Sequence, residues 1–422
     1  MQPTVSLDRS VIAVRHDEVV HVMLELTAPT APVLARPPLD IVVVLDRSGS
    51  MSGAPIAAVT AATAQLLRLA GPDDRIGVVT FHSDVDVVLP LARHDADIAG
   101  RVVRGITTAG STNLSGGWLK ALELLAAAPR PGAIQRIVLL TDGHANAGVT
   151  DTDALATMVR GGHGQGITTS CIGFADGYQE ELLASLADAG MGNEYFCAGP
   201  DHAQAVFGTE FEGLASVVAQ NISIEIAPTA AVAAFNVLNE FPATTNDQGV
   251  TTISLGDAYG DEQRRVLIAF NLRPLGDAGS FDVATFTVRW ASTLGPVSMH
   301  TVTLPLTLTA DNDPNGIDVG ADPRVTEHVL VLRAAEARRE ARRLADEGRF
   351  EQAASALEAG VVFLTDAAAP LADVDEMRRD ADELRHGMWS MEQSKRQFSR
   401  SRNVTKGRRT NFDDPQDQNP PN

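Results

Sequence analysis

The chain has 422 residues, of which 44% are hydrophobic and 21% are charged, and its formal net charge is −20. This length is enough for two or three domains with a large core. The negative charge argues against a nucleic-acid-binding body, because like charge repels phosphate. No run approaches the roughly 18 apolar residues of a membrane helix, and the first residues do not resemble a signal peptide. We therefore expect a soluble, cytoplasmic protein with no transmembrane segment.

Two further features of composition concern the cellular setting. Cys171 and Cys197 are the only cysteines, and both lie in apolar, strand-like contexts. We predict that they are buried thiols rather than a disulfide or a metal-binding pair. Arginine greatly outnumbers lysine and alanine is abundant, which suggests a GC-rich bacterial genome.

The N-terminal segment has the pattern of an antiparallel strand. Residues 4–27 alternate in places between apolar and polar side chains, and residues 28–38 are proline-rich. Because an isolated strand pair is only marginally stable, we predict that residues 1–37 join a β-sandwich formed later in the chain. The domain between them would then be inserted into that sandwich.

Strands and amphipathic helices alternate over residues 38–219, with short Gly-, Pro- and Asp-containing turns. This alternation predicts an α/β domain with a doubly wound parallel sheet. The predicted strands are Asp40–Leu45, Arg75–Phe81, Val85–Pro90, Arg136–Thr141, Ile167–Phe174 and Asn193–Cys197. The predicted helices are Pro55–Ala70, Asp95–Arg104, Leu114–Ala127, Asp151–Arg160, Gln179–Ala189 and Asp201–Gln220.

Small oxygen-bearing side chains follow two of these strands and open one of the helices. Parallel sheets place their ligand sites just beyond the carboxyl ends of the strands. Hard oxygen donors without bulky neighbours are what a Mg²⁺-like ion needs. The candidate metal ligands are Asp46, Ser48, Ser50, Thr112 and Asp142.

Other roles are open to residues of this region. Asp46, Ser48 and Ser50 could simply cap the helix near Pro55, since Asp and Ser are favoured at helix N-termini, but capping does not explain all five residues together. We expect Gly110 and Asn113 to shape the loop around Thr112. We expect His82 and His144 to be surface residues, because imidazole suits softer ions than Mg²⁺.

Residues 220–310 change in character, with β-branched, partly alternating segments between turns, and predict a β-sandwich. Residues 311–323 form an acidic linker rich in Gly, Pro and Asp. The linker contains half of an EF-hand pattern, Asp311-x-Asp313-x-Asn315-Gly316 with Asp322 in the twelfth place. The strand-like sequence before it and Pro314 within it favour a solvated linker over a calcium site.

The C-terminal part is predicted to be helical over residues 324–398. Gly348 divides a helical hairpin, and a third helix is expected from Leu371 to about Met391. Residues 399–422 are expected to be a polar, partly disordered tail. The stretch 385–409 is rich in basic residues, which favours either a solvated helix end or a site for an acidic partner, a membrane surface or nucleic acid.

The motif Asp46-x-Ser48-x-Ser50 with Thr112 and Asp142 resembles the metal-ion-dependent adhesion site (MIDAS) of the von Willebrand factor A (VWA) family. The resemblance implies a Rossmann-like fold in which the hydroxyls bind Mg²⁺ or Mn²⁺ directly and the aspartates often act through water. It also implies an open coordination position for an Asp or Glu carboxylate of a partner protein.

Two further segments resemble plant VWA-containing RING-type ubiquitin ligases. They are Leu255-Gly-Asp-Ala-Tyr-Gly-Asp-Glu and Leu332-Arg-Ala-Ala-Glu-Ala-Arg-Arg, and the similarity spans about residues 37–400. A RING needs about eight Cys or His zinc ligands, and two cysteines cannot supply them. The resemblance therefore implies the architecture and a partner-binding role without ligase activity.

The sequence thus favours a non-catalytic, metal-dependent protein-interaction module. The alternative is a regulatory scaffold whose basic C-terminal stretch binds an acidic partner. A hydrolase or phosphotransferase is less well supported. Asp46 after a strand resembles an aspartyl-phosphate site, but Ser48 stands where a second acid is expected and no partner lysine is obvious.

Overall fold

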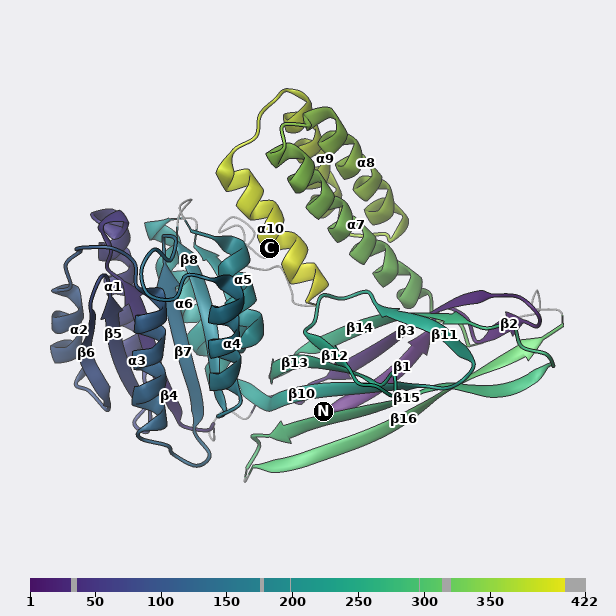
Figure 1. The fold of residues 1–422 in the computed structure, drawn as a ribbon, viewed down its shortest axis with the longest axis horizontal. Coiled ribbons are helices and arrows are strands. Elements are labelled where there is room, and N and C mark those ends of the chain that lie inside the picture. Colours follow the sequence, from purple (N-terminus) through teal and green to yellow (C-terminus); the bar gives the residue numbers. More distant parts are fainter. Residues whose placement is uncertain (32–35, 175–177, 198, 296, 313–319, 407–422) are drawn as a thin grey trace, which may run out of the picture.

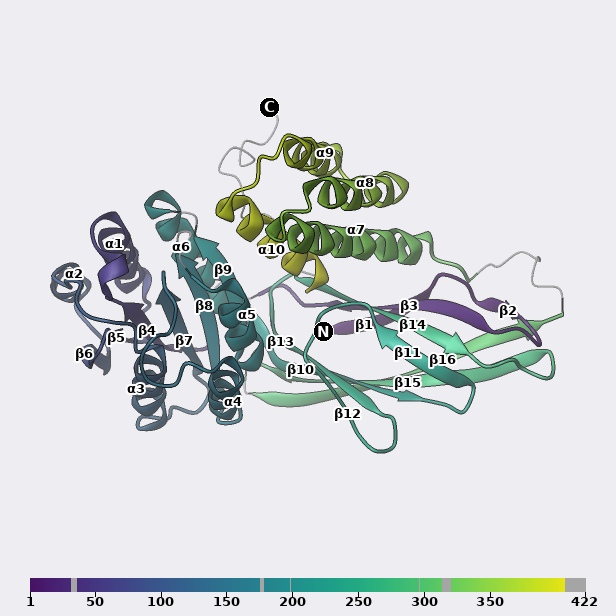
Figure 2. The ribbon, with the colours of Figure 1, turned by 45° about the horizontal axis from the view of Figure 1, so that its top comes forward.

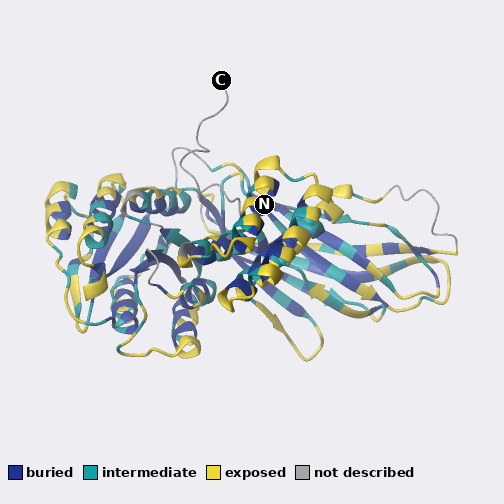
Figure 3. Cartoon of the chain, turned by 90° about the horizontal axis from the view of Figure 1, so that it is seen from above, coloured by how far each residue is buried: buried dark blue, intermediate teal, exposed yellow. Residues whose placement is uncertain are grey.

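The computed structural model describes residues 1–31, 36–174, 178–197, 199–295, 297–312 and 320–406. The chain forms an α/β part, a part built of two β-sheets, and a set of helices that lies against both (Figure 1). Buried residues concentrate on the central strands and on the inner helix faces (Figure 3). In the described residues, no helix is both long and apolar enough to cross a membrane.

The α/β part contains a six-stranded sheet in the order β6-β5-β4-β7-β8-β9. All its neighbouring strands are parallel except the antiparallel pair β5 and β6. Its strands are β4 (Leu39–Asp46), β5 (Arg75–Phe81), β6 (Val85–Ala92), β7 (Ile134–Thr141), β8 (Ile167–Phe174) and β9 (Met191–Cys197). Every residue of β4 is buried, as expected for a β-branched central strand that helices cover on both faces.

Helices cover the two faces of this sheet in two groups. The 3₁₀ turn is Gly49–Met51, and the helices are α1 (Ala54–Leu69), α2 (Ala96–Arg104), α3 (Leu114–Ala126), α4 (Thr152–His163), α5 (Glu180–Ala189) and α6 (Pro200–Ala215). Helices α1, α2 and α6 share one hydrophobic core with the sheet, and α3, α4 and α5 share the other. The predicted doubly wound α/β fold is confirmed.

Two sheets, antiparallel except for the parallel pair β16 and β2, enclose a third core. One has the order β1-β3-β14-β11 and the other β12-β13-β10-β15-β16-β2. The strands are β1 (Gln2–Leu7), β2 (Val11–Ala13), β3 (Glu18–Thr27), β10 (Val217–Pro228), β11 (Val232–Val237), β12 (Ala243–Thr245), β13 (Thr251–Tyr259), β14 (Gln263–Leu272), β15 (Gly279–Ser292) and β16 (Ser298–Asp311). Since β3 pairs with β14, the α/β part lies between two strands of one β unit. We call this unit the β body.

The junction between α6 and β10 differs from the sequence prediction. The predicted helix to Gln220 is wrong, because α6 ends at Ala215 and β10 begins at Val217. Val217 and Val218 are buried, and β10 pairs on both sides, with β13 and with β15. These non-local strand contacts outweigh the local helical pattern.

The C-terminal helices are α7 (Pro323–Asp346), α8 (Phe350–Asp366), α9 (Leu371–Arg385) and α10 (Met391–Thr405). The third helix does not continue to Met391 as predicted. It ends at Arg385, Gly387 adopts a positive φ of 69°, and a capping box of Ser390 and Gln393 starts α10. The predicted polar tail from residue 399 is helical up to Thr405. Residues 313–319, with the central part of the half EF-hand pattern, and residues 407–422 lie outside the described residues.

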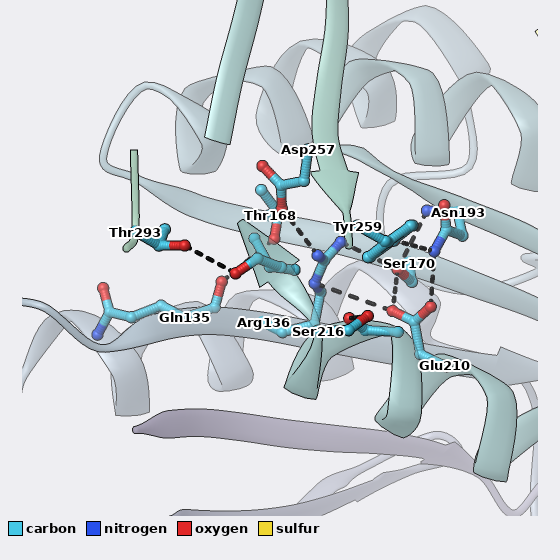
Figure 4. Close-up of polar contacts among 12 residues, drawn as sticks. Gln135, Arg136, Thr168, Ser170, Asn193, Glu210, Ser216, Asp257, Tyr259 and Thr293 are labelled. Atoms are coloured by element: carbon cyan, nitrogen blue, oxygen red, sulfur yellow. Dashed lines mark hydrogen bonds and ion pairs between the residues drawn. The ribbon is translucent and has the colours of Figure 1, made fainter. Parts of the chain in front are cut away.

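A buried polar network joins the α/β part to the β body (Figure 4). The Arg136 side chain of β7 is 1% exposed; its Nη2 donates to Asp257 Oδ2 of β13 at 3.0 Å, and its Nη1 donates to Ser170 Oγ at 3.2 Å. Glu210 of α6 accepts from Ser170 Oγ at 2.5 Å and from Asn193 Nδ2 at 2.7 Å. The network therefore ties three elements of the sheet and α6 to β13.

Charge balance is what makes this burial possible. Burial alone would lower the pKa of Arg136, but Glu210 and Asp257 outweigh that effect and raise it. Burial raises the pKa of Asp257, although Arg136 opposes the shift. Asp257 belongs to the Leu255-Gly-Asp-Ala-Tyr-Gly segment noted in the sequence, so that segment serves to hold the two parts together.

Replacing Arg136 with Ala should destabilise the protein strongly. The change leaves Asp257 and Glu210 buried without their cation, and breaking such a pair costs about 3–5 kcal/mol. Urea denaturation followed by tryptophan fluorescence measures the loss. Arg378→Ala, at an exposed pair with Asp375, is the matched control and should change the free energy of unfolding by less than about 1 kcal/mol. Equal effects of the two substitutions would contradict the assigned role of Arg136.

Candidate metal centre

All five predicted ligands lie at the carboxyl-terminal edge of the α/β sheet. Asp46 is the last residue of β4, Ser48 is the N-cap of the following 3₁₀ turn, and Ser50 lies within that turn. Thr112 precedes α3, and Asp142 follows β7. Strands β4 and β7 are parallel neighbours, so their ends meet at one place. The two aspartates are brought together by the register of the sheet.

Hydrogen bonds connect four of these residues directly. Ser50 Oγ donates to Asp142 Oδ1 at 2.7 Å, and Ser48 Oγ lies 3.1 Å from Ser50 Oγ. Asp46 Oδ1 accepts from the Ser48 backbone N–H at 2.8 Å. Ser48 and Ser50 therefore connect the aspartate that ends β4 to the aspartate that follows β7.

Gly143 locates the fifth residue, Thr112, in the same site. A Cβ placed on Gly143 would lie 3.6 Å from Ser50 Oγ and 3.8 Å from Thr112 Oγ1. Glycine thus leaves a small space bordered by hydroxyl groups from two different loops. The structure brings all five predicted residues to one location.

Two supporting residues were not identified from the sequence. Thr141 Oγ1 donates to Asp46 Oδ2 at 2.6 Å, and Asn146 Oδ1 accepts from the Thr112 N–H at 2.7 Å. Thr141 stands directly before Asp142, so its position at the end of β7 was a usable signal. Asn146 lies in a loop with no pattern that distinguishes it.

The loop around Thr112 is shaped by the residues expected to shape it. Gly110 has a φ of 67°, and a Cβ there would lie only 2.6 Å from Ser83 Oγ. Asn113 caps α3 by accepting from the Gly116 N–H. His144 is exposed, and His82 Nδ1 accepts from the Asp84 N–H.

Asp46 and Asp142 are buried acids whose charge is not balanced by an arginine or lysine among the described ion pairs. Burial raises the pKa of Asp46 despite hydrogen bonds from Thr141 and Ser48, and the charge of Asp142 adds to the shift. Burial likewise raises the pKa of Asp142, with Ser50 opposing. Among the described ion pairs, neither carboxylate has an arginine or lysine partner. Two negative charges are thus held close together with only hydroxyl and amide donors around them.

This donor set fits a hard divalent cation. Carboxylate and hydroxyl oxygens suit Mg²⁺ and Mn²⁺ better than softer ions, and the space beside Gly143 borders two of the hydroxyls. Within the described ranges, no group of three or more His, Cys, Asp or Glu side chains could form a different metal site. The centre is open on one side, because Ser50 is exposed while Asp46 and Thr112 are buried.

Relatives of known sequence share parts of this chain. An uncharacterized protein of Synechocystis is 27% identical over 308 residues, which are 70% of this chain and 71% of that protein. The E3 ubiquitin-protein ligase WAV3 of Arabidopsis thaliana is 29% identical over 242 residues, 55% of this chain and 31% of the ligase. Escherichia coli YfbK is 29% identical over 194 residues, 45% of this chain and 34% of YfbK. The chain thus spans about a third of the last two.

Solved structures share the fold over nearly the whole chain. A von Willebrand factor type A protein from Catenulispora acidiphila superposes with a TM-score of 0.70 at 18% identity and covers 89% of both chains. The ArnB paralog VWA2 from Sulfolobus acidocaldarius gives a TM-score of 0.63 at 16% identity over 96% of this chain and 97% of that one. The sequence pattern of the von Willebrand factor type A domain matches residues 40–208. This chain therefore contains a VWA domain, which is the α/β part with the cluster of Asp46, Ser48, Ser50, Thr112 and Asp142 at its edge.

Proposed function

We propose that the protein is a non-catalytic interaction module that binds an acidic group of a partner protein through a divalent cation. VWA domains are commonly protein-interaction modules. The observation that carries the proposal is the convergence of three hydroxyls and two buried carboxylates that have no arginine or lysine partner among the described ion pairs. A Mg²⁺ or Mn²⁺ ion would supply the missing positive charge.

The residues divide into two roles in this proposal. Ser48, Ser50 and Thr112 offer neutral oxygens to the ion, and Asp46 and Asp142 offer charge, directly or through water. Because the hydroxyls would add no negative charge, an ion held here would remain strongly electrophilic. Five protein residues would leave room for a further ligand of a six-coordinate ion, and solvent reaches the cluster at the exposed Ser50. A partner's Asp or Glu carboxylate is the expected occupant.

The alternative, a scaffold that presents its basic stretch to an acidic partner, has less support. Lys395, Arg402 and Lys406 of that stretch already form ion pairs with acidic residues of the VWA domain. The name of the Arabidopsis relative refers to ubiquitin ligation, but the chain spans only 31% of that protein, and its two cysteines are buried and free. We therefore do not extend ligase activity to this chain.

Gly143→Ala should weaken metal binding and leave the fold intact. The added methyl would make ordinary contacts with Ser50 and Thr112 in the metal-free protein but would take up the space that an ion between them needs. A crowding cost of about 1–3 kcal/mol in the metal-bound state corresponds to roughly five- to 150-fold weaker binding. Isothermal titration calorimetry with MgCl₂ and MnCl₂ measures the affinity. Gly161→Ala, where a Cβ meets nothing within 4 Å, is the matched control and should bind like the wild type. Absence of binding by the wild-type protein would reject the proposed metal site.

Asp142→Asn should stabilise the metal-free protein at neutral pH. The folded state raises the pKa of Asp142 above its ordinary value of 3.8. The folded state binds the Asp142 proton more tightly than the unfolded state does. The group therefore contributes stability below pH 3.8, and this contribution is lost as the pH rises through the pKa of the folded state. Removing the charge should raise the free energy of unfolding in EDTA by about 0.5–2 kcal/mol at pH 7 and by nearly nothing below about pH 4. Urea denaturation at both pH values tests this, with exposed Asp247→Asn as the control. A loss of stability at pH 7 would contradict the charge argument.

Partner binding should depend on the cation. Immobilised wild-type protein with Mg²⁺ should retain a partner that EDTA releases, and the Asp142→Asn variant should retain none under either condition. Mass spectrometry of the eluates identifies the partner. A partner retained equally in EDTA and by the variant would show that binding does not use this centre.

A further inference from the structure

The basic helix α10 lies between the VWA domain and α7 (Figure 2). Its residues contact the VWA domain, α7 and the β body. Arg402 binds Asp188 of α5 in the VWA domain, Ser394 Oγ accepts from Arg342 Nε of α7 at 2.9 Å, and Thr405 O accepts from Asn239 Nδ2 of the β body at 3.0 Å.

Two acidic residues on α5 pair with two basic residues on α10. Glu180 and Asp188 stand eight residues apart on α5, about 12 Å at 1.5 Å per residue. Lys395 and Arg402 stand seven residues apart on α10, which is two helical turns and hence the same face. Lys395 Nζ lies 3.4 Å from Glu180 Oε2, and Arg402 Nη2 lies 2.7 Å from Asp188 Oδ1. The two helices are complementary in charge and in spacing.

Lys395 is the most unusual residue of this interface, since its side chain is fully buried. Its ammonium donates to the Tyr178 carbonyl at 2.7 Å and lies 3.9 Å from the centre of the Tyr178 ring. A carbonyl, an aromatic face and the Glu180 carboxylate together compensate a charge that is costly to bury. A helix end in solvent would make none of these contacts. The Lys395 side chain therefore occupies a specific site on the VWA domain.

Asp188 shows the same compensation at the other end of α5. Burial alone would raise the pKa of Asp188, but Arg402 and Lys406 outweigh it and hold the pKa below its usual value. Lys406 Nζ donates to Asp188 Oδ1 at 2.7 Å. The acidic group is therefore adapted to a cationic partner, and Arg402 of α10 and Lys406 directly after it both serve as one.

Tyr178 connects this interface to the edge of the sheet that carries the metal centre. A Cβ on Gly173 of β8 would overlap the Tyr178 ring, so the ring packs directly on that strand. Gly173 pairs with Thr141 of β7. Thr141 in turn donates to Asp46 Oδ2. An unbroken series of contacts thus leads from Lys395 to an aspartate of the centre.

We propose that the face formed by Tyr178 and α5 is a second binding surface of the VWA domain, specific for a basic helix. Helix α10 of the same chain occupies it as a releasable clamp. Docked α10 holds Tyr178 against β8 and so keeps Thr141 and Asp46 in the arrangement that binds metal. Release of α10 weakens metal binding, and bound metal strengthens the docking of α10, because such coupling is reciprocal. The coupling between α10 docking and metal binding rests on the proposed function.

Hydrogen exchange of the full-length protein in EDTA tests the clamp without any metal. Arg402→Glu and Asp188→Arg each place like charges together, and each should speed exchange of the α10 amides at least about tenfold. The double variant restores an opposite pair, but the new carboxylate at position 402 faces Glu194 and the new guanidinium at position 188 faces Lys406. Exchange in the double variant should therefore be slower than in either single variant without reaching the wild-type rate. Arg385→Glu, in the same basic stretch but paired with exposed Glu358 and Asp382, should leave α10 unchanged. Unchanged exchange in the single variants, or no rescue in the double variant, would overturn the clamp.

Protein concentration distinguishes an intramolecular clamp from helix exchange between two copies. Protection of α10 should be the same across a hundredfold dilution, and sedimentation should show no dimer that dissociates in parallel with it. Protection that falls on dilution would overturn docking within one chain.

Calorimetry tests the coupling to the metal centre. Arg402→Glu should bind Mg²⁺ about fivefold more weakly or worse, and Mg²⁺ should slow α10 exchange in the wild type by the same factor. Equal Mg²⁺ affinity of the wild type and Arg402→Glu, within twofold, would overturn the coupling. If the wild type binds no Mg²⁺, the proposed function fails, while the exchange experiment in EDTA still decides whether α10 is clamped.

Discussion

Compensation of buried negative charge is the constraint on which this structure depends. Asp40 is fully buried and is paired with Arg75 and Arg130, and Asp74 is paired with Arg36. The same rule holds where the parts of the chain meet. An unpaired carboxylate inside a protein is costly enough that it normally acquires a cation or a proton. Asp46 and Asp142 stand apart because hydroxyl and backbone N–H groups, rather than arginine, surround them. This difference is the reason we propose these two residues as part of a metal site.

Local patterns were sufficient to predict the VWA domain and to select five residues that the structure brings together. Strand β4 is apolar along its length and ends in an aspartate, and the helix that begins at Leu114 follows a hydroxyl-bearing loop. Because parallel strands end at one edge, residues separated by almost a hundred positions could be assigned to one site. Thr141 was missed as a contributor because a threonine at the end of a strand has an ordinary structural role.

Non-local contacts decided what the sequence did not reveal. Val217 reads locally as a continuation of α6, yet pairing with β13 and β15 makes it the start of a strand. Helix α10 has a polar sequence that resembles a disordered tail. Its order comes from partners more than two hundred residues away, such as Tyr178 for Lys395. A window of neighbouring residues contains no information about such partners.

The insertion of the VWA domain into the β body gives its two ends different roles. The chain enters at Leu39 and leaves near Val217, and the network of Arg136, Glu210 and Asp257 closes this junction. The metal centre lies at the opposite end, beyond the carboxyl ends of β4 and β7. A partner bound there, as we propose, would lie at the edge of the sheet that Thr141, Gly173 and Tyr178 connect to α10. The proposed coupling therefore runs through Tyr178 and the charged face of α5 and not through the Arg136 network at the base of the sheet.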